Sequence, residues 1–110
     1  MTRYRWGDVV LVAFPLSDMS GTRRRPGLVV YDSGDEDVML ARITTQEARE
    51  RTDVPLLGWK GAGLIAKSVV RLSKVATIKK SLIDRRLGRL AAQDSVAVRK
   101  SWAKMFPSAR

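Results

Sequence analysis

The sequence predicts a small, mainly β domain that ends in a single α-helix, and two patterns support this fold class. Short apolar runs separated by glycine, proline or acidic residues recur as far as residue 90, which is typical of short strands joined by turns. Beyond them, Val98, Trp102 and Met105 are spaced by four and three residues, which places them on one face of a helix. The 110 residues contain no repeat or linker, so we expect one domain, 1–110.

Five to seven short strands are expected before the helix. The run 9–14 is the clearest, because it is continuously apolar, follows Gly7-Asp8 and ends at Pro15. The polar stretches 17–22 and 47–53 are expected to be loops. The helix should have about three turns, with Asp94 near its start, Trp102 in the core and Pro107 at its end. The expected strands are 9–14, 28–31, 38–43, 54–57, 69–78 and 87–90.

The positive charge lies mainly in the second half of the chain. The formal net charge is +10, from 21 basic and 11 acidic residues, and residues 61–110 hold twelve basic and two acidic residues. Such a field on a small body attracts polyanions and speeds their capture. Nucleic acid is the leading candidate partner, ahead of an anionic membrane surface or an acidic protein.

Two residue types are absent, histidine and cysteine. Without cysteine there is no disulfide framework, which fits a reducing compartment. Without histidine the chain lacks the commonest general base and transition-metal ligand, so we expect no metal site and no cofactor. No apolar run approaches the length of a membrane span, and no signal peptide is recognisable. We therefore expect a cytoplasmic protein that does not bind a membrane.

RNA carries its own nucleophile, the 2′-hydroxyl, so a protein without histidine can cleave it by orienting this oxygen and stabilising charge on the phosphate. Arginine suits the second task, because its planar guanidinium is always charged. Arg25 and Thr44 are the candidate catalytic residues, since each lies where a predicted strand meets a polar loop. Pro26 favours extended backbone at Arg25, which places that arginine at a strand entrance. The alternative is that Arg25 belongs to a solvated basic run and that Thr44 is an ordinary strand residue.

Three further side chains have functional interpretations with structural alternatives. Arg71 projects from an apolar strand, either to contact a phosphate or simply on a solvated face. Trp59 is a candidate for stacking on an unpaired base. Asp18, in the polar stretch before Arg25, either acts as a base or accepts backbone hydrogen bonds in a turn.

These residues occur in an order that resembles the MazF/PemK/Kid family of toxin–antitoxin ribonucleases, and the PemK-like branch fits best. The similarity spans nearly the whole chain. The stretches that carry it are Gly7-Asp8-Val9-Val10-Leu11-Val12, Phe14-Pro15, Arg25-Pro26-Gly27-Leu28-Val29-Val30, Ile43-Thr44-Thr45, Ala62-Gly63-Leu64, Ser68-Val69-Val70-Arg71-Leu72, Ala76-Thr77-Ile78 and Leu87-Gly88-Arg89-Leu90.

The resemblance implies an SH3-like barrel with a C-terminal helix, normally a homodimer. It also implies metal-independent cleavage of single-stranded RNA, such as mRNA, at short motifs, which leaves a cyclic phosphate and a 5′-hydroxyl and inhibits translation and growth. Arg25 matches the family arginine that acts on the scissile phosphate, Thr44 its catalytic threonine, and Arg71 an arginine that Kid-like members use in the same site. The implied partner is an antitoxin with a flexible acidic tail. Candidate RNA contacts are Arg23, Arg24, Thr45, Gln46 and Trp59.

Two departures from the family pattern leave the proton-accepting group open. Some relatives have a Gly-Ser-Glu-Gln stretch in the first loop, where this chain has Met19-Ser20-Gly21-Thr22, and Kid-like proteins have an aspartate where this chain has Ser73. Asp18 is the hypothesised substitute. The alternatives to a ribonuclease are a gyrase-binding toxin of the CcdB type, whose C-terminus differs from Pro107-Ser108-Ala109-Arg110, and a nucleic-acid-binding barrel without catalytic activity.

Overall fold

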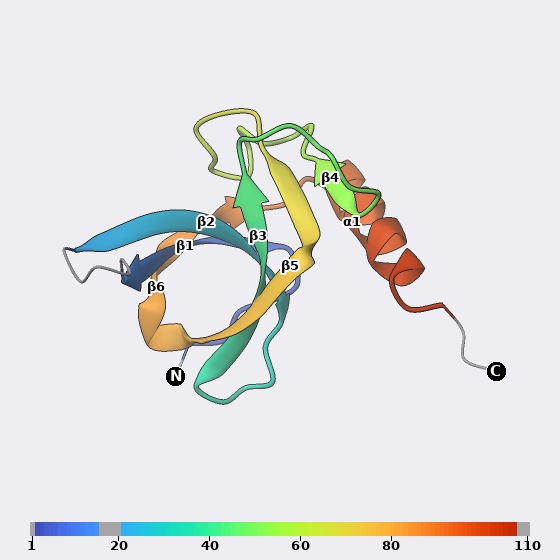
Figure 1. The fold of residues 1–110 in the computed structure, drawn as a ribbon. Coiled ribbons are helices and arrows are strands. Elements are labelled where there is room, and N and C mark those ends of the chain that lie inside the picture. The colour runs from blue at the N-terminus through green and yellow to red at the C-terminus, as the bar shows by residue number, and fades with distance from the viewer. Residues whose placement is uncertain (1, 16–20, 108–110) are drawn as a thin grey trace.

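The computed structural model describes residues 2–15 and 21–107, with only the backbone described for Phe14, Pro15 and Thr22. Within these ranges, six antiparallel strands form one strongly curled sheet, and a single α-helix packs beside it (Figure 1). The elements are β1 (Asp8–Pro15), β2 (Thr22–Tyr31), β3 (Asp37–Thr44), β4 (Asp53–Pro55), β5 (Val69–Lys79), the 3-10 turn η1 (Lys80–Leu82), β6 (Ile83–Arg89) and α1 (Ala92–Lys104). The predicted fold class and the predicted number of strands are thus confirmed.

The order of the strands across the sheet is β4-β5-β3-β2-β1-β6. β4 and β6 are therefore its two edges, and in the described residues they do not pair with each other. The sheet has the curl of a small barrel but stays open between these edges (Figure 1). β2 pairs with β3 from Gly27 and Arg42 onward, whereas its first residues pair only with β1.

Apolar residues alternate between the two sides of the sheet, so each side buries its own cluster. Val9, Leu28 and Ile43 belong to the cluster that also contains Val98 of α1. The second cluster lies on the inner side of the curl. Its buried members are Val10, Val12, Val29, Val38 and Leu40. Burial of these aliphatic side chains stabilises the curled sheet. The same alternation directs Arg25 and Arg42 to the inner side, together with Val29 and Leu40.

The helix packs as its apolar spacing predicts, with Val98 fully buried and Trp102 and Met105 packed against the same cluster. Asp94, in the first turn, does more than offset the helix dipole. Its carboxylate accepts hydrogen bonds from the backbone N–H groups of Leu57 and Gly58, at 3.0 and 2.8 Å. These bonds attach the segment between β4 and β5 to the start of α1.

Two local predictions need correction. Arg25 does not lie at a strand entrance, because β2 begins at Thr22 and its residues 23–25 pair with β1. The ladder with β1 extends the strand through the basic run, whereas the apolar pattern predicts a strand only from residue 28. The last strand begins at Ile83 rather than at 87, again because it pairs with β1. Most of the expected 17–22 loop, including Asp18, lies outside the described residues.

Candidate functional site

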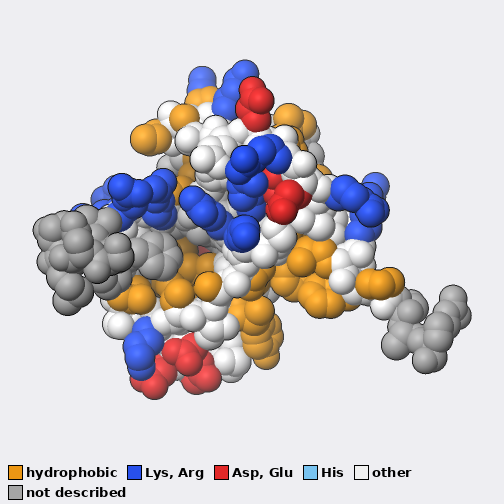
Figure 2. Space-filling model, in the orientation of Figure 1, with side chains coloured by type: hydrophobic (Ala, Val, Ile, Leu, Met, Phe, Trp, Pro, Cys, Tyr) orange, Lys and Arg blue, Asp and Glu red, His pale blue; other side chains and the backbone are white. Residues whose placement is uncertain are grey.

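Arg25 lies on the inner side of the curled sheet, at the rim of a cavity. The cavity has a volume of about 420 Å³, and Arg42 and Lys74 lie at it as well. Its apolar lining includes Val12 and Leu40. Three cationic side chains from β2, β3 and β5 therefore gather around one apolar hollow. On the face that Figure 2 shows, Lys and Arg side chains gather across the middle, above a hollow in which hydrophobic side chains are visible.

Thr44 lies on the same side of the sheet as Arg25. Gly27 pairs with Arg42. Arg25 and Thr44 each lie two residues from this pair on their own strands, so strand alternation directs both to the same side of the sheet. Beyond the Gly27–Arg42 pair the two strands part, because β2 continues along β1 while β3 continues along β5 (Figure 1). Arg25 and Arg42 both line the first cavity, here called the opening, and Thr44 lies two residues beyond Arg42 at the end of β3.

A second cavity, of about 400 Å³, begins next to Thr44. Three residues expected to contact RNA, namely Thr45, Gln46 and Trp59, all line it, together with Lys67. Thr44 itself is half-buried, and its Oγ1 accepts a hydrogen bond from the backbone N–H of Gln46 at 3.2 Å. Thr44 thus lies in sequence between Arg42, which lines the first cavity, and Thr45, which lines the second.

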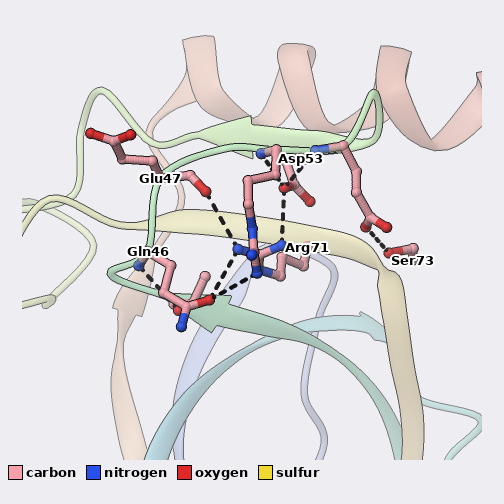
Figure 3. Close-up of polar contacts among 8 residues, drawn as sticks. Gln46, Glu47, Asp53, Arg71 and Ser73 are labelled. Carbon is pink, nitrogen blue, oxygen red and sulfur yellow. Dashed lines mark hydrogen bonds and ion pairs between the residues drawn. The ribbon is translucent and has the colours of Figure 1, made fainter.

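Arg71 is buried and paired, so the alternative that it belongs to a solvated face is wrong. It is only 5% exposed, and its Nη1 lies 3.2 Å from Asp53 Oδ2. Its Nη2 donates to Gln46 Oε1 at 3.2 Å and to the backbone oxygen of Glu47 at 3.4 Å (Figure 3). The position of Asp53, 18 residues earlier, explains the burial, because a buried guanidinium requires a counter-charge and hydrogen-bond acceptors.

The buried Asp53 carboxylate holds the loop between β3 and β4 by hydrogen bonds. Its Oδ2 accepts the backbone N–H groups of Arg49 and Glu50 in addition to the guanidinium, whereas its buried Oδ1 has no hydrogen-bond partner among the described residues. Glu50 in turn accepts the hydroxyl of Ser73 at 2.6 Å. The two ends of the loop are therefore held by one buried ion pair (Figure 3).

Arg23 and Arg24 differ in their surroundings, although both are exposed on β2. Arg24 Nε lies 3.1 Å from Asp84 Oδ2, so a carboxylate of the protein partly neutralises its charge. Strand alternation places Arg23 on the same side of the sheet as Arg25, and Arg24 on the other side.

Sequence reasoning missed Arg42, Lys74 and Lys67 as parts of the site. The signal for Arg42 was its position two residues before Thr44, which in a strand means the same face. No comparable signal marks Lys74, because β5 is irregular between Arg71 and Val75, where its pairing with β3 shifts register. In the described part of the chain, no three acidic side chains form a group that could hold a metal ion.

A protein-family model described as PemK-like, MazF-like toxin of type II toxin-antitoxin system matches residues 5–106. The chain belongs to this family. The match confirms the resemblance read from the sequence, and residues 5–106 include both cavities and the paired arginine. None of the proteins with curated descriptions matches the sequence significantly.

Solved structures of MazF proteins and of mycobacterial endoribonucleases share the fold. One chain of the MazE–MazF complex from Deinococcus radiodurans has 17% sequence identity to this chain. The match covers 99% of this chain and 100% of that chain, with a TM-score of 0.75. The Mycobacterium tuberculosis toxin MazF-mt6 is 24% identical, with a TM-score of 0.68 over 92% and 99%. An endoribonuclease in complex with its cognate antitoxin, from a mycobacterial species, is 18% identical, with a TM-score of 0.75 over 97% and 100%. No helix in the described ranges has the length and hydropathy that crossing a membrane requires.

Proposed function

We propose that this toxin is an endoribonuclease that cuts single-stranded RNA at short motifs and thereby arrests translation and growth. The observation that carries the proposal is the opening lined by Arg25, Arg42 and Lys74, three cationic side chains around one apolar hollow. Thr44 follows Arg42 by two residues on the same strand, which places both on one side of the sheet. Three cations from three strands suit the phosphates of a single strand. The endoribonucleases of the same fold are consistent with this activity.

The proposed reaction uses the RNA's own 2′-hydroxyl as nucleophile and needs no metal ion or other cofactor. The 2′-oxygen attacks the phosphorus, the bond from phosphorus to the 5′-oxygen breaks, and the products are a 2′,3′-cyclic phosphate and a 5′-hydroxyl. Arg25 stabilises the charge on the phosphoryl oxygens. Thr44 donates a hydrogen bond to the same group, since its lone pair accepts Gln46 N–H and its proton stays free to donate. Asp18 is the proposed base that takes the 2′-hydroxyl proton, and the leaving 5′-oxygen takes up a proton from solvent water.

The cavity beside Thr44 is proposed to hold a neighbouring unpaired base. Trp59 is half-buried there and offers a ring face, while Lys67 supplies a positive charge at the same cavity. Thr45 and Gln46 line the cavity and have polar groups that can hydrogen-bond to a base. The catalytic residues and the base-binding residues then follow one RNA strand across the surface.

Two protein partners belong to the proposal. An antitoxin with an acidic tail would neutralise the cationic opening and compete with RNA, as the antitoxin complexes of proteins with the same fold suggest. A second copy of the chain forms a homodimer, which the exposed apolar side chains Leu57 and Ile65, at 74% and 98%, support. Light scattering on the purified chain measures that dimer directly.

The test is incubation of long single-stranded RNA with the protein in excess EDTA, with 5′ and 3′ ends analysed after cleavage. Native protein should cut and Arg25→Ala should not, whereas Lys100→Ala, which removes one exposed charge from α1, should cut like the native protein. Intact RNA with strong salt-dependent binding would instead indicate a binding barrel without catalytic activity. Gyrase inhibition without RNA damage would indicate a toxin of the CcdB type.

A further inference from the structure

Two guanidinium groups converge on the side chain of Gln46. Its Oε1 accepts hydrogen bonds from Arg71 Nη2 at 3.2 Å and from Arg49 Nη2 at 3.3 Å. A guanidinium only donates hydrogen bonds, so the amide oxygen rather than the amide nitrogen must face both arginines. The nitrogen consequently points away from Arg71 (Figure 3). The orientation of this amide is therefore set by its neighbours.

The arginine that sets this orientation is itself fixed. The side chain of Arg71 is 6% exposed, and its Nη1 is paired with the fully buried carboxylate of Asp53. That carboxylate also accepts the backbone N–H groups of Arg49 and Glu50, so it holds the same loop on which Gln46 lies. Because Arg71 is buried and enclosed by protein groups, it influences a ligand at the surface only through the residues to which it is hydrogen-bonded.

The amide nitrogen of Gln46 has no acceptor among the described residues, and Gln46 lines the cavity that contains Trp59 and Lys67. A base that stacks on a tryptophan face leaves its edge available for hydrogen bonds. A fixed N–H₂ group beside such a base distinguishes an acceptor on that edge from a donor, because two donors facing each other leave both unpaired.

We propose that Gln46 selects the RNA base held in this cavity by donating a hydrogen bond to an acceptor oxygen or nitrogen on its edge, and that Arg71 is the positioning residue for Gln46. This inference rests on the proposed function, since it takes single-stranded RNA as the ligand. It assigns Arg71 an action through Gln46 rather than on the reacting phosphate.

The test is cleavage of a random-sequence RNA pool followed by sequencing of the cut ends. Gln46→Met keeps the size of the side chain and removes the donor, so preference at one RNA position should weaken by roughly 2- to 10-fold, the worth of one hydrogen bond. Gln46→Glu replaces the donor with an acceptor and should shift the preference toward bases with a donor at that edge. Lys100→Ala is the control, and unchanged preference in both Gln46 variants would overturn the proposal.

Arg71→Lys keeps the charge but loses the two-pronged guanidinium that holds Gln46 and Asp53. It should alter preference at the same RNA position as Gln46→Met. Equal loss of kcat on all sequences with the preference intact would mean that Arg71 acts at the phosphate or only in folding. If thermal unfolding shows that Arg71→Lys is not folded, Arg49→Ala replaces it, because Arg49 is exposed and holds the same oxygen.

The proposed function can fail without deciding this inference. If the native protein leaves the pool uncut, enrichment of bound RNA from the same pool measures base preference with the same variants. A preference that Gln46→Met removes supports the inference, and binding without any preference at all overturns it.

Discussion

Thr44 accepts a hydrogen bond from the backbone N–H of Gln46, with 3.2 Å between its Oγ1 and that nitrogen. A hydroxyl bonded to the N–H two residues later closes a tight turn at the end of a strand. The turn therefore ends β3 and fixes the hydroxyl oxygen, while the hydroxyl proton has no acceptor among the described residues. It also directs Gln46 back toward Arg71.

Thr44→Val tests whether the hydroxyl takes part in the reaction. Valine keeps the shape and the β-branch of threonine, so the fold should persist, but kcat should fall by about 10²- to 10³-fold, as when one hydrogen-bond donor to a developing charge is removed. Thr44→Ser should retain most of the activity. Single-turnover cleavage of a short RNA measures both, and a Thr44→Val variant with native kcat would remove Thr44 from the mechanism.

Arg42→Ala and Lys74→Ala test whether the cationic opening neutralises phosphates. Each contact to a single strand adds about 0.7 to the magnitude of the slope of log affinity against log salt. Each variant should therefore lower this slope by about that amount, while Lys100→Ala leaves it unchanged. Fluorescence anisotropy with a labelled RNA at several salt concentrations provides the slopes. Native slopes in both variants would place the RNA elsewhere on the surface.

Asp53→Ala tests the contribution of the buried pair to stability. Removal of the carboxylate leaves the Arg71 guanidinium buried without a counter-charge, so the free energy of unfolding should fall by about 3–5 kcal/mol. The matched control is Glu36→Ala, which removes an exposed partner of Lys79 and should cost at most about 1 kcal/mol. Urea unfolding monitored by tryptophan fluorescence compares the two. Similar losses in both variants would contradict the structural role of the pair.

Asp32 makes the free energy of unfolding depend on pH in the acidic range. Burial acts to raise the pKa of this carboxyl, but the backbone N–H groups of Tyr4 and Gly34 and the Lys80 ammonium outweigh it, so its folded pKa lies below the ordinary value. A lowered folded pKa means that the stabilisation is complete above the unfolded pKa, about 3.9, and is lost as the pH falls through the folded pKa. Asp32→Asn should therefore be less stable near neutral pH and lose less stability on acidification. Thermal unfolding between neutral pH and strong acid measures both curves, and parallel curves would refute the prediction.

The strands and the helix could be predicted because their signals are local. Apolar alternation and the spacing of Val98, Trp102 and Met105 depend only on neighbours in the sequence, and both patterns led to elements that the structure contains. The burial of Arg71 could not be predicted in this way, because it depends on pairing with Asp53 across two strands. The extension of β2 through its basic run likewise depends on β1 as a partner.

The residues of the candidate site also differ in whether the sequence alone could identify them. Thr45, Gln46 and Trp59 are brought to one cavity, although Trp59 comes from a different segment of the chain. Arg42 has only one sequence signal, its position two residues before Thr44, and Lys74 has none. A charged residue in a strand does not indicate which other strands will curl toward it. Curvature of the sheet, which surrounds the hollow, follows from the twist of six paired strands rather than from any short motif.

The two edges of the open sheet affect the tendency of the chain to aggregate at high protein concentration. An unpaired strand edge is a template for intermolecular pairing and aggregation. β4 offers only three residues, the last of which is the exposed Pro55, and β6 carries the exposed charges of Asp84, Arg85 and Arg86. Short length, proline and like-charged arginines all discourage a neighbouring chain from extending the ladder. An open sheet can thus avoid continuous strand pairing between molecules at high concentration, although its two edges do not pair with each other in the described residues.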